Sequence, residues 1–207
     1  MNNFRVQDVL ASYDRLAGEI VPDYESLTFE EVHRETLDLL PPPSAAILDI
    51  GAGTGRDAAW FARRGHEVAA VEPSRELRRA GRELHESPAI TWIDDCLPDL
   101  NLVCEAGSAF DLIWLSAMWM HVPPDDRARA FRTLASLLKP GGNMMFSLRL
   151  GPLPTERPMA PVSASEIRNL ARNSDLETVH VSRHEDAAGR PEISWDMVWL
   201  RRPGTGG

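Results

Sequence analysis

The stretch Asp49-Ile50-Gly51-Ala52-Gly53-Thr54-Gly55 decides the fold. It follows the apolar run 45–50 and precedes a helical pattern over 56–64, so it forms the loop between a buried strand and a helix. Glycines suit this loop because the chain turns sharply and no Cβ keeps a ligand away from the backbone. Amides at the start of the next helix favour a carboxylate or phosphate. The stretch therefore predicts a ligand site at the carboxyl end of this strand.

Glu72 ends the next predicted strand, 67–71, about 20 residues after the loop. A carboxylate at this place accepts hydrogen bonds from two ribose hydroxyls, so the loop and the acid together indicate a nucleoside-type cofactor. The dinucleotide pattern GxGxxG requires a third glycine where Arg56 stands. This disfavours NAD, although a nicotinamide enzyme stays an alternative.

Short apolar runs alternate with helical patterns along most of the chain, which is typical of βαβ units. We predict an α/β fold with a Rossmann-like, doubly wound, seven-stranded sheet, mostly parallel with an antiparallel last strand and helices on both faces. The predicted strands are 45–50, 67–71, 90–93, 110–115, 144–148, 177–181 and 193–200. Helices are predicted to begin near residues 7, 28, 56, 75 and 163, and a further helix contains the leucines at 134–138. Capping boxes open the helices at 28 and 163.

The 207 residues, 43% of them hydrophobic and 26% charged, indicate one domain. We expect an N-terminal helical lid over 1–43, a cofactor-binding core over 44–150, a C-terminal helix and β-hairpin over 151–202 and a disordered tail over 203–207. The first of these helices is predicted for 7–17.

The composition is strongly acidic, with 22 Lys and Arg residues against 31 Asp and Glu residues and a net charge of −9. Such a charge repels a phosphate backbone and disfavours nucleic acid as a partner. Cys96 and Cys104 form no disulfide framework and no metal-ligand pattern, so we expect no metal. No signal peptide is evident, and the apolar run 110–122 is too short to span a bilayer. We therefore expect a soluble cytoplasmic protein with no membrane partner, as a monomer or a homodimer.

The segment 47–74, ILDIGAGTGRDAAWFARRGHEVAAVEPS, resembles the first two motifs of class I S-adenosylmethionine-dependent methyltransferases. The segments 92–96 and 110–116 resemble the third and fourth motifs, and 137–142 resembles the LLKPGG turn before the fifth strand. The resemblance covers about 47–148. It implies the cofactor S-adenosylmethionine and the product S-adenosylhomocysteine.

The resemblance also assigns cofactor residues. It implies that Asp49 and the glycine loop hold the methionine moiety, that Glu72 holds the ribose, and that Asp94 or Asp95 accepts from the adenine amino group. Tyr13 matches a tyrosine that closes over the cofactor in many small-molecule members. The full predicted cofactor set is Asp49, Gly51, Ala52, Gly53, Gly55, Glu72, Pro73, Asp94, Asp95, Cys96, Leu115, Ser116 and Tyr13.

The loop 116–123 follows the fourth predicted strand and is expected over the transferred methyl group. His121 is the candidate catalytic residue, as a base or a hydrogen-bond partner of the substrate, but packing against the next helix explains it as well. Trp119 and Met120 either line an aromatic acceptor pocket or pack in the core.

Arg149 and Arg157 lie where substrate loops gather in this fold, and a guanidinium group binds a carboxylate through two hydrogen bonds. Solvated surface arginines are the alternative. Tyr24 is a further candidate near the cofactor and substrate. Asp57, in the first turn of its helix, is explained by the helix dipole alone.

The sequence predicts transfer of a methyl group to an O, N or S atom of a small-molecule acceptor by in-line displacement. No motif for amino methylation of a flipped base or for cytosine C5 chemistry is present. The alternatives are a methyltransferase for protein or peptide side chains and an S-adenosylmethionine-binding protein without transfer activity.

Overall fold

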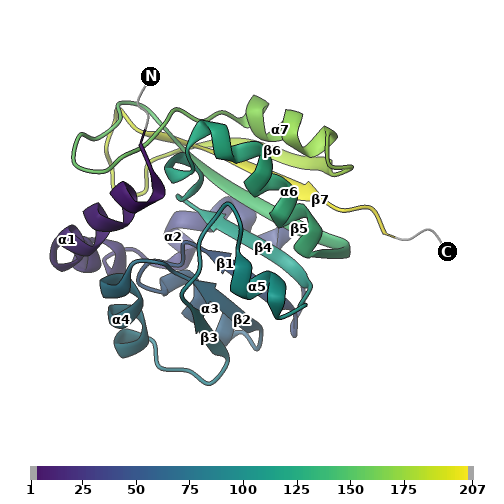
Figure 1. The fold of residues 1–207 in the computed structure, drawn as a ribbon, viewed down its shortest axis with the longest axis horizontal. Coiled ribbons are helices and arrows are strands. Elements are labelled where there is room, and N and C mark those ends of the chain that lie inside the picture. The colour runs from purple at the N-terminus through teal and green to yellow at the C-terminus, as the bar shows by residue number, and fades with distance from the viewer. Residues whose placement is uncertain (1–3, 205–207) are drawn as a thin grey trace.

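The computed structural model describes residues 4–204 and contains the predicted seven-stranded sheet (Figure 1). The strands are β1 Ala46–Ile50, β2 Glu67–Val71, β3 Ile90–Ile93, β4 Phe110–Ser116, β5 Leu138–Leu150, β6 Glu177–Glu185 and β7 Ser194–Arg201. Their order in the sheet is β3-β2-β1-β4-β5-β7-β6. β7 is antiparallel to both β5 and β6, while the pairs among β1 to β5 are parallel. The predicted fold class, including the antiparallel last strand, is confirmed.

Seven α-helices accompany the sheet in the described residues. They are α1 Val6–Glu25, α2 Phe29–His33, α3 Arg56–Arg63, α4 Arg75–Leu84, α5 Asn101–Glu105, α6 Arg127–Leu137 and α7 Ala164–Arg172. Short 3-10 helices cover Arg34–Leu39, Trp119–His121 and Pro124–Asp126. The capping box before α2 is confirmed, since the Thr28 hydroxyl accepts from the Glu31 amide at 3.2 Å and the Thr28 amide donates to the Glu31 carboxylate at 2.7 Å.

The first helix is longer than predicted. It continues to Glu25 through Pro22, which has no N–H to donate within a helix. Ile20, on this second half of α1, is buried in a small apolar cluster with Leu77 of α4. Burial against α4 thus stabilises a segment that the local sequence disfavours.

Three other local features differ from the prediction. Ser163 caps α7 by accepting from the Glu166 amide at 3.2 Å, but the Glu166 side chain completes no capping box, because it pairs with Arg127 at 2.9 Å. α5 was not predicted, and β5 begins at Leu138, before the predicted 144, because the glycine turn itself continues the strand.

The two faces of the sheet have separate cores, formed by alternate strand residues. Leu48 and Ile113 face a core covered by α5, α6 and α7. Ile47 and Leu112 face a second core, rich in aromatic rings, covered by α2 and α3. The strand order reverses between the neighbours β1 and β4, so the crevice at their carboxyl ends is the expected ligand position.

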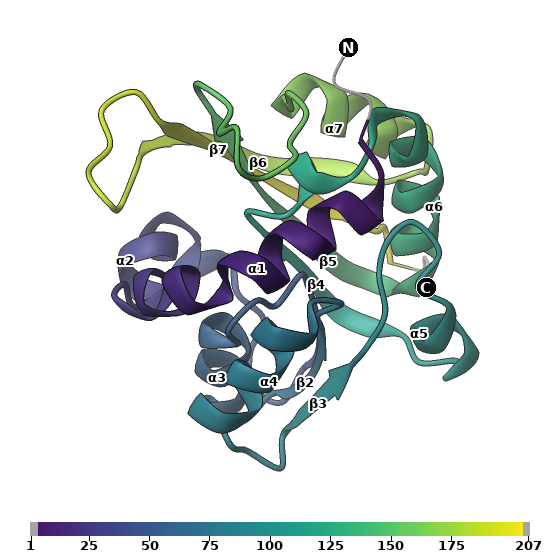
Figure 2. The same ribbon diagram turned by 60° about the vertical axis from the view of Figure 1, so that its left-hand side comes forward.

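α1 crosses this carboxyl edge of the sheet, as Figure 2 shows. The Ser74 hydroxyl at the start of α4 donates to Asp14 at 2.5 Å, and Arg15 donates to the Glu156 carbonyl at 3.4 Å. α1 therefore contacts loops from both halves of the sheet. Of the tail predicted to be disordered, residues 205–207 lie outside the described range. No helix within residues 4–204 has the length and apolarity to cross a membrane.

Candidate functional site

The glycine loop follows β1 and has the backbone that only glycine adopts easily. The φ angles of Gly51, Gly53 and Gly55 are +69°, +59° and +84°. A Cβ on Gly51 would lie 2.9 Å from the Met118 side chain, and a Cβ on Gly55 would lie 2.8 Å from the Trp92 ring. Both the turn and its close neighbours therefore require glycine.

Glu72 lies at the end of β2, against this loop. Its carboxylate accepts from the Gly53 amide at 2.7 Å and from the Ser74 amide at 2.8 Å. The residue is only 6% exposed. Burial raises the pKa of Glu72 to about 7, although both amide bonds act in the opposite direction.

Asp49, the penultimate residue of β1, is the most buried acid of the predicted set, with 1% exposure. Its Oδ2 atom is buried with no hydrogen-bond partner within residues 4–204. Burial raises the pKa of this carboxyl well above its usual range, and the charges of Asp57 and Glu72 add to the effect. An ammonium group would supply both the missing donor and the missing charge, so the site fits the amino group of the cofactor's methionine moiety.

The two acids proposed for adenine have protein partners already. Asp95 accepts from the amides of Leu102 and Val103 at 2.8 and 3.2 Å, in the first turn of α5. Asp94 is exposed and pairs with Arg78 at 2.6 Å. Asp95 therefore stabilises a helix that the sequence did not reveal. Pro73 and Cys96 are partly buried, and Leu115 is fully buried.

Tyr13 of α1 and His121 form a hydrogen bond across the site, with Tyr13 Oη 2.8 Å from His121 Nε2. The His121 Nδ1 atom lies 2.8 Å from the Pro158 carbonyl oxygen, which only accepts, so Nδ1 carries the proton. In the neutral ring, Nε2 then accepts from the Tyr13 hydroxyl. Burial lowers the pKa of His121 to about 4, which makes it a weak base near pH 7. This geometry favours a positioning role over proton abstraction.

Tyr24 and Arg157 continue this cluster. Arg157 donates to the Tyr24 hydroxyl at 3.2 Å, and its guanidinium carbon lies 5.8 Å from the centre of the Tyr13 ring. The Tyr24 ring lies against the glycine loop, since a Cβ on Gly53 would be 3.7 Å from it. The two tyrosines of α1 therefore connect the glycine loop to His121 and Arg157. Arg149, near the end of β5, donates to the Pro152 carbonyl at 2.6 Å.

Trp119 and Met120 are both buried. Trp119 is fully buried with edge contacts to the rings of Phe131 and Phe146, and Met120 is 1% exposed. Trp119 thus packs among core residues, which was one of the two interpretations of the sequence.

Asp57 has a larger role than its position in the helix predicted. Asp57 Oδ2 lies 2.8 Å from His33 Nε2 and accepts from the Trp114 indole at 2.9 Å, while Oδ1 accepts from Arg56 at 2.8 Å. Burial opposes its ionisation, but the charges of Arg56 and His33 hold the pKa of Asp57 well below its usual range. No spacing in the sequence links His33 and Trp114 to this acid.

Ser116 Oγ lies 3.4 Å from the same His33 Nε2 atom. The arrangement therefore differs from a Ser-His-Asp triad, in which the serine and the acid contact different ring nitrogens. The hydrogen bonds of His33 and Asp57 with Trp114 and Ser116 therefore link α2, α3 and β4.

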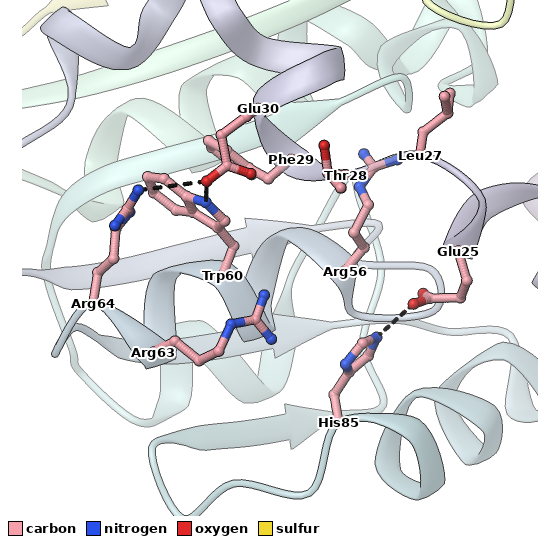
Figure 3. A pocket seen from close by; sticks show the side chains of 10 residues that line it. All are labelled: Glu25, Leu27, Thr28, Phe29, Glu30, Arg56, Trp60, Arg63, Arg64 and His85. Carbon is pink, nitrogen blue, oxygen red and sulfur yellow. Dashed lines mark hydrogen bonds and ion pairs between the residues drawn. The ribbon is translucent and has the colours of Figure 1, made fainter.

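A surface pocket of about 340 Å³ is lined by residues from the end of α1, from α2 and from α3, and by His85 (Figure 3). None of its residues was among the predicted site residues. Glu25, the last residue of α1, points toward His85 at 3.0 Å and accepts from the Thr54 hydroxyl of the glycine loop. Glu30 accepts from the Trp60 indole and pairs with Arg64 at 3.4 Å. The pocket wall therefore fixes the C-terminal end of α1 to the glycine loop.

Residues 47–142 match the family described as a methyltransferase domain. The ubiquinone biosynthesis O-methyltransferase of Xanthomonas axonopodis pv. citri is 34% identical over 166 residues, which are 80% of this chain and 64% of that protein. The enzyme of the same name from Xanthomonas campestris pv. campestris strain B100 is 34% identical over 62% of this chain and 52% of that protein. The chain thus spans 52–64% of the length of these curated relatives.

Solved structures share the fold. The 1,6-didemethyltoxoflavin-N1-methyltransferase of Burkholderia thailandensis, solved with 1,6-didemethyltoxoflavin and S-adenosylhomocysteine, has a TM-score of 0.68 and 19% identity over 94% of this chain and 88% of that one. The [4+2]-cyclase SpnF has a TM-score of 0.73 and 14% identity over 99% of both chains. At such identities the likeness concerns the fold alone.

Proposed function

Because the chain belongs to the class I S-adenosylmethionine-dependent methyltransferases, we propose that it transfers the methyl group of S-adenosylmethionine to an O, N or S atom of a small molecule. The observation that carries the proposal is the buried Asp49 carboxyl, with its unpartnered Oδ2 beside the glycine loop and Glu72. The glycine loop allows a ligand to approach the backbone closely. The Asp49 carboxyl suits an ammonium group, and the Glu72 carboxyl suits the hydroxyls of a ribose.

When bound, the sulfonium supplies an already activated methyl group, so the protein contributes mainly alignment and exclusion of water. Asp49 and the glycine loop would hold the methionine moiety, and Glu72 would exchange its bonds to the Gly53 and Ser74 amides for ribose hydroxyls. The Tyr13 bond to His121 and the Tyr24 contact with Gly53 hold α1 over the site and limit the access of water.

A small acceptor is supported by the lid. α1 lies across the carboxyl edge and contacts loops on both sides of the sheet, which hinders the approach of a folded protein to the glycine loop. The acidic chain permits a basic peptide as the alternative acceptor. The relatives' names, O-methyltransferases of ubiquinone biosynthesis, favour an oxygen atom as the nucleophile.

A second candidate is cofactor binding without methyl transfer. The cyclase SpnF has this fold over its whole length, so the fold alone does not require methylation. In that case Asp49 and Glu72 would still bind S-adenosylmethionine.

The test incubates the protein with methyl-labelled S-adenosylmethionine and a size-fractionated bacterial extract, with Asp49→Asn as the comparison. We expect label in the low-mass fraction with the unmodified protein and little with the variant. Label in the protein fraction would select the peptide alternative. Tight S-adenosylhomocysteine binding with no label in any fraction would select the second candidate.

A further inference from the structure

Arg149 and Arg157 bring two guanidinium groups to the carboxyl edge of an acidic protein. Arg149 lies near the end of β5 and Arg157 lies in the loop that follows, and both are partly buried. Neither forms an ion pair with an acid among residues 4–204, although the chain has nine more acidic than basic residues. A partly buried arginine without a counter-ion has lost hydration without electrostatic compensation.

Most of the hydrogen-bonding capacity of the two side chains is also free. A guanidinium group carries five N–H donors. Arg157 directs one to the Tyr24 hydroxyl at 3.2 Å, and Arg149 directs one to the Pro152 carbonyl at 2.6 Å. These neutral acceptors orient the groups without neutralising them, which leaves a fork of donors for a planar anion.

The neighbouring charges do not neutralise the pair. Asp186 of the β6–β7 loop is held by Arg190 at 2.7 Å and by the Trp195 indole at 2.8 Å. Glu192, the other acid near Arg149, is exposed. Burial lowers the pKa of Arg149. The positive charges of Arg190 and Arg157 lower it further, and their effect exceeds the opposite effect of Asp186 and Glu192. The edge is therefore locally positive and favours an anion.

We propose that Arg149 and Arg157 bind an anionic group, a carboxylate or a phosphate, on the methyl acceptor. This inference rests on the proposed methyl transfer. The Tyr24 hydroxyl contacts Arg157 while its ring lies against Gly53, so about one aromatic ring separates the anion site from the glycine loop. The acceptor is thus a small acid whose nucleophilic atom is distinct from its charged group.

The methionine carboxylate of the cofactor has the same chemistry, so the experiment must separate the two sources. The variants are Arg149→Gln and Arg157→Gln, with Arg132→Gln, an exposed arginine on α6, as the matched control. Calorimetry with S-adenosylhomocysteine measures whether each arginine contributes to cofactor affinity. We expect all three variants to bind it within about threefold of the unmodified protein, because Asp49, the loop and Glu72 are unchanged.

The acceptor arm compares benzoate with its uncharged isostere benzamide by saturation-transfer NMR, with and without S-adenosylhomocysteine. We expect benzoate to bind at least about tenfold more tightly than benzamide to the unmodified protein and to the control, and Arg157→Gln to abolish the preference. Equal binding of the two probes to the unmodified protein would overturn the inference. So would a tenfold loss of S-adenosylhomocysteine affinity in Arg157→Gln with the benzoate preference intact, which would assign the arginine to the cofactor.

Both arms measure binding, so they decide the inference even if the protein transfers no methyl group. The transfer assay adds a third readout when the low-mass extract is first divided on an anion exchanger. A labelled product formed with the retained, anionic pool as the source of acceptor supports the inference. A labelled product formed only with the unretained pool contradicts it. Benzoate preference with no label in either pool would leave the anion site in place and reject the proposed methyl transfer alone.

Discussion

The two halves of the candidate site are built in different ways. Asp49, the glycine loop and Glu72 come from 24 consecutive residues, 49–72, and the Glu72 carboxylate is held by backbone amides. The lid half joins Tyr13 to His121 and Tyr24 to Arg157, pairs that are 108 and 133 residues apart, through side-chain hydrogen bonds. The first half depends on the backbone of one strand-loop-helix unit, whereas the second depends on how α1 packs on the rest of the fold.

This difference determines what a mutation does. Changes in the loop half act on a backbone that also supports the sheet, so they reduce stability as well as binding. Changes in the lid half remove single side-chain contacts at the carboxyl edge, so they alter binding and titration while the fold persists. The predictions below test this contrast, from the largest expected effect to the smallest.

Gly55→Ala is expected to have the largest effect. The left-handed backbone costs an alanine about 1–2 kcal/mol, and contact with Trp92 adds about 1–3 kcal/mol of overpacking. Gly141→Ala is the matched control, since Gly141 also has a positive φ but open space at its Cβ position. Urea denaturation should give a loss of about 2–5 kcal/mol for Gly55→Ala and about 1–2 kcal/mol for the control. Equal losses would show that crowding by Trp92 contributes nothing.

Asp57→Asn is expected to cost about 3 kcal/mol, because it removes a buried charge from His33 and Arg56. Asp111→Asn is the comparison, since the Asp111–Lys139 pair is more than a third exposed and should be worth about 0–1 kcal/mol. The pKa of Asp57 is depressed in the folded state, so its contribution is present above the unfolded pKa and is lost as the pH falls below it. Denaturant titrations at pH 7 measure both variants, and a loss no larger than that of Asp111→Asn would contradict a buried structural role.

The same contrast explains what the sequence could reveal. The strands have local signatures in hydrophobic period and spacing, and so do the places of the glycine loop after β1 and of Glu72 after β2, so these positions in the fold could be predicted with few errors. The contacts of Asp57 were missed because its partners His33 and Trp114 are distant in sequence and join it only when α2, α3 and β4 pack together. For the lid, residue types were predicted, but their mutual geometry was not, because it depends on tertiary packing that extends α1 through Pro22.

Glu72 should make cofactor binding depend on pH in the neutral range. Its pKa is raised to about 7 in the folded protein, so the carboxyl is mainly protonated at pH 6 and mainly ionised at pH 8. The linked stability is fully present below the unfolded pKa and is lost as the pH rises through about 7. If the ionised form accepts from the ribose, S-adenosylhomocysteine affinity should rise about tenfold between pH 6 and pH 8. Calorimetry with Glu72→Gln should give weaker binding with a flat profile, and the same slope in that variant would assign the titration to another group.

Tyr13→Phe should have the smallest effect on stability, about 1 kcal/mol, because it removes one hydroxyl and leaves its ring in place. Its specific consequence is on His121, whose neutral form the Tyr13 hydroxyl stabilises by donating to Nε2. Without that donor the pKa of His121 should move upward from about 4, toward the ordinary value for histidine. Tyr24→Phe is the control, because it removes a hydroxyl bonded to Arg157 and leaves the Tyr13–His121 bond intact. An NMR titration of the His121 ring protons distinguishes the variants, and an unchanged pKa in Tyr13→Phe would mean that the lid is not held through Nε2.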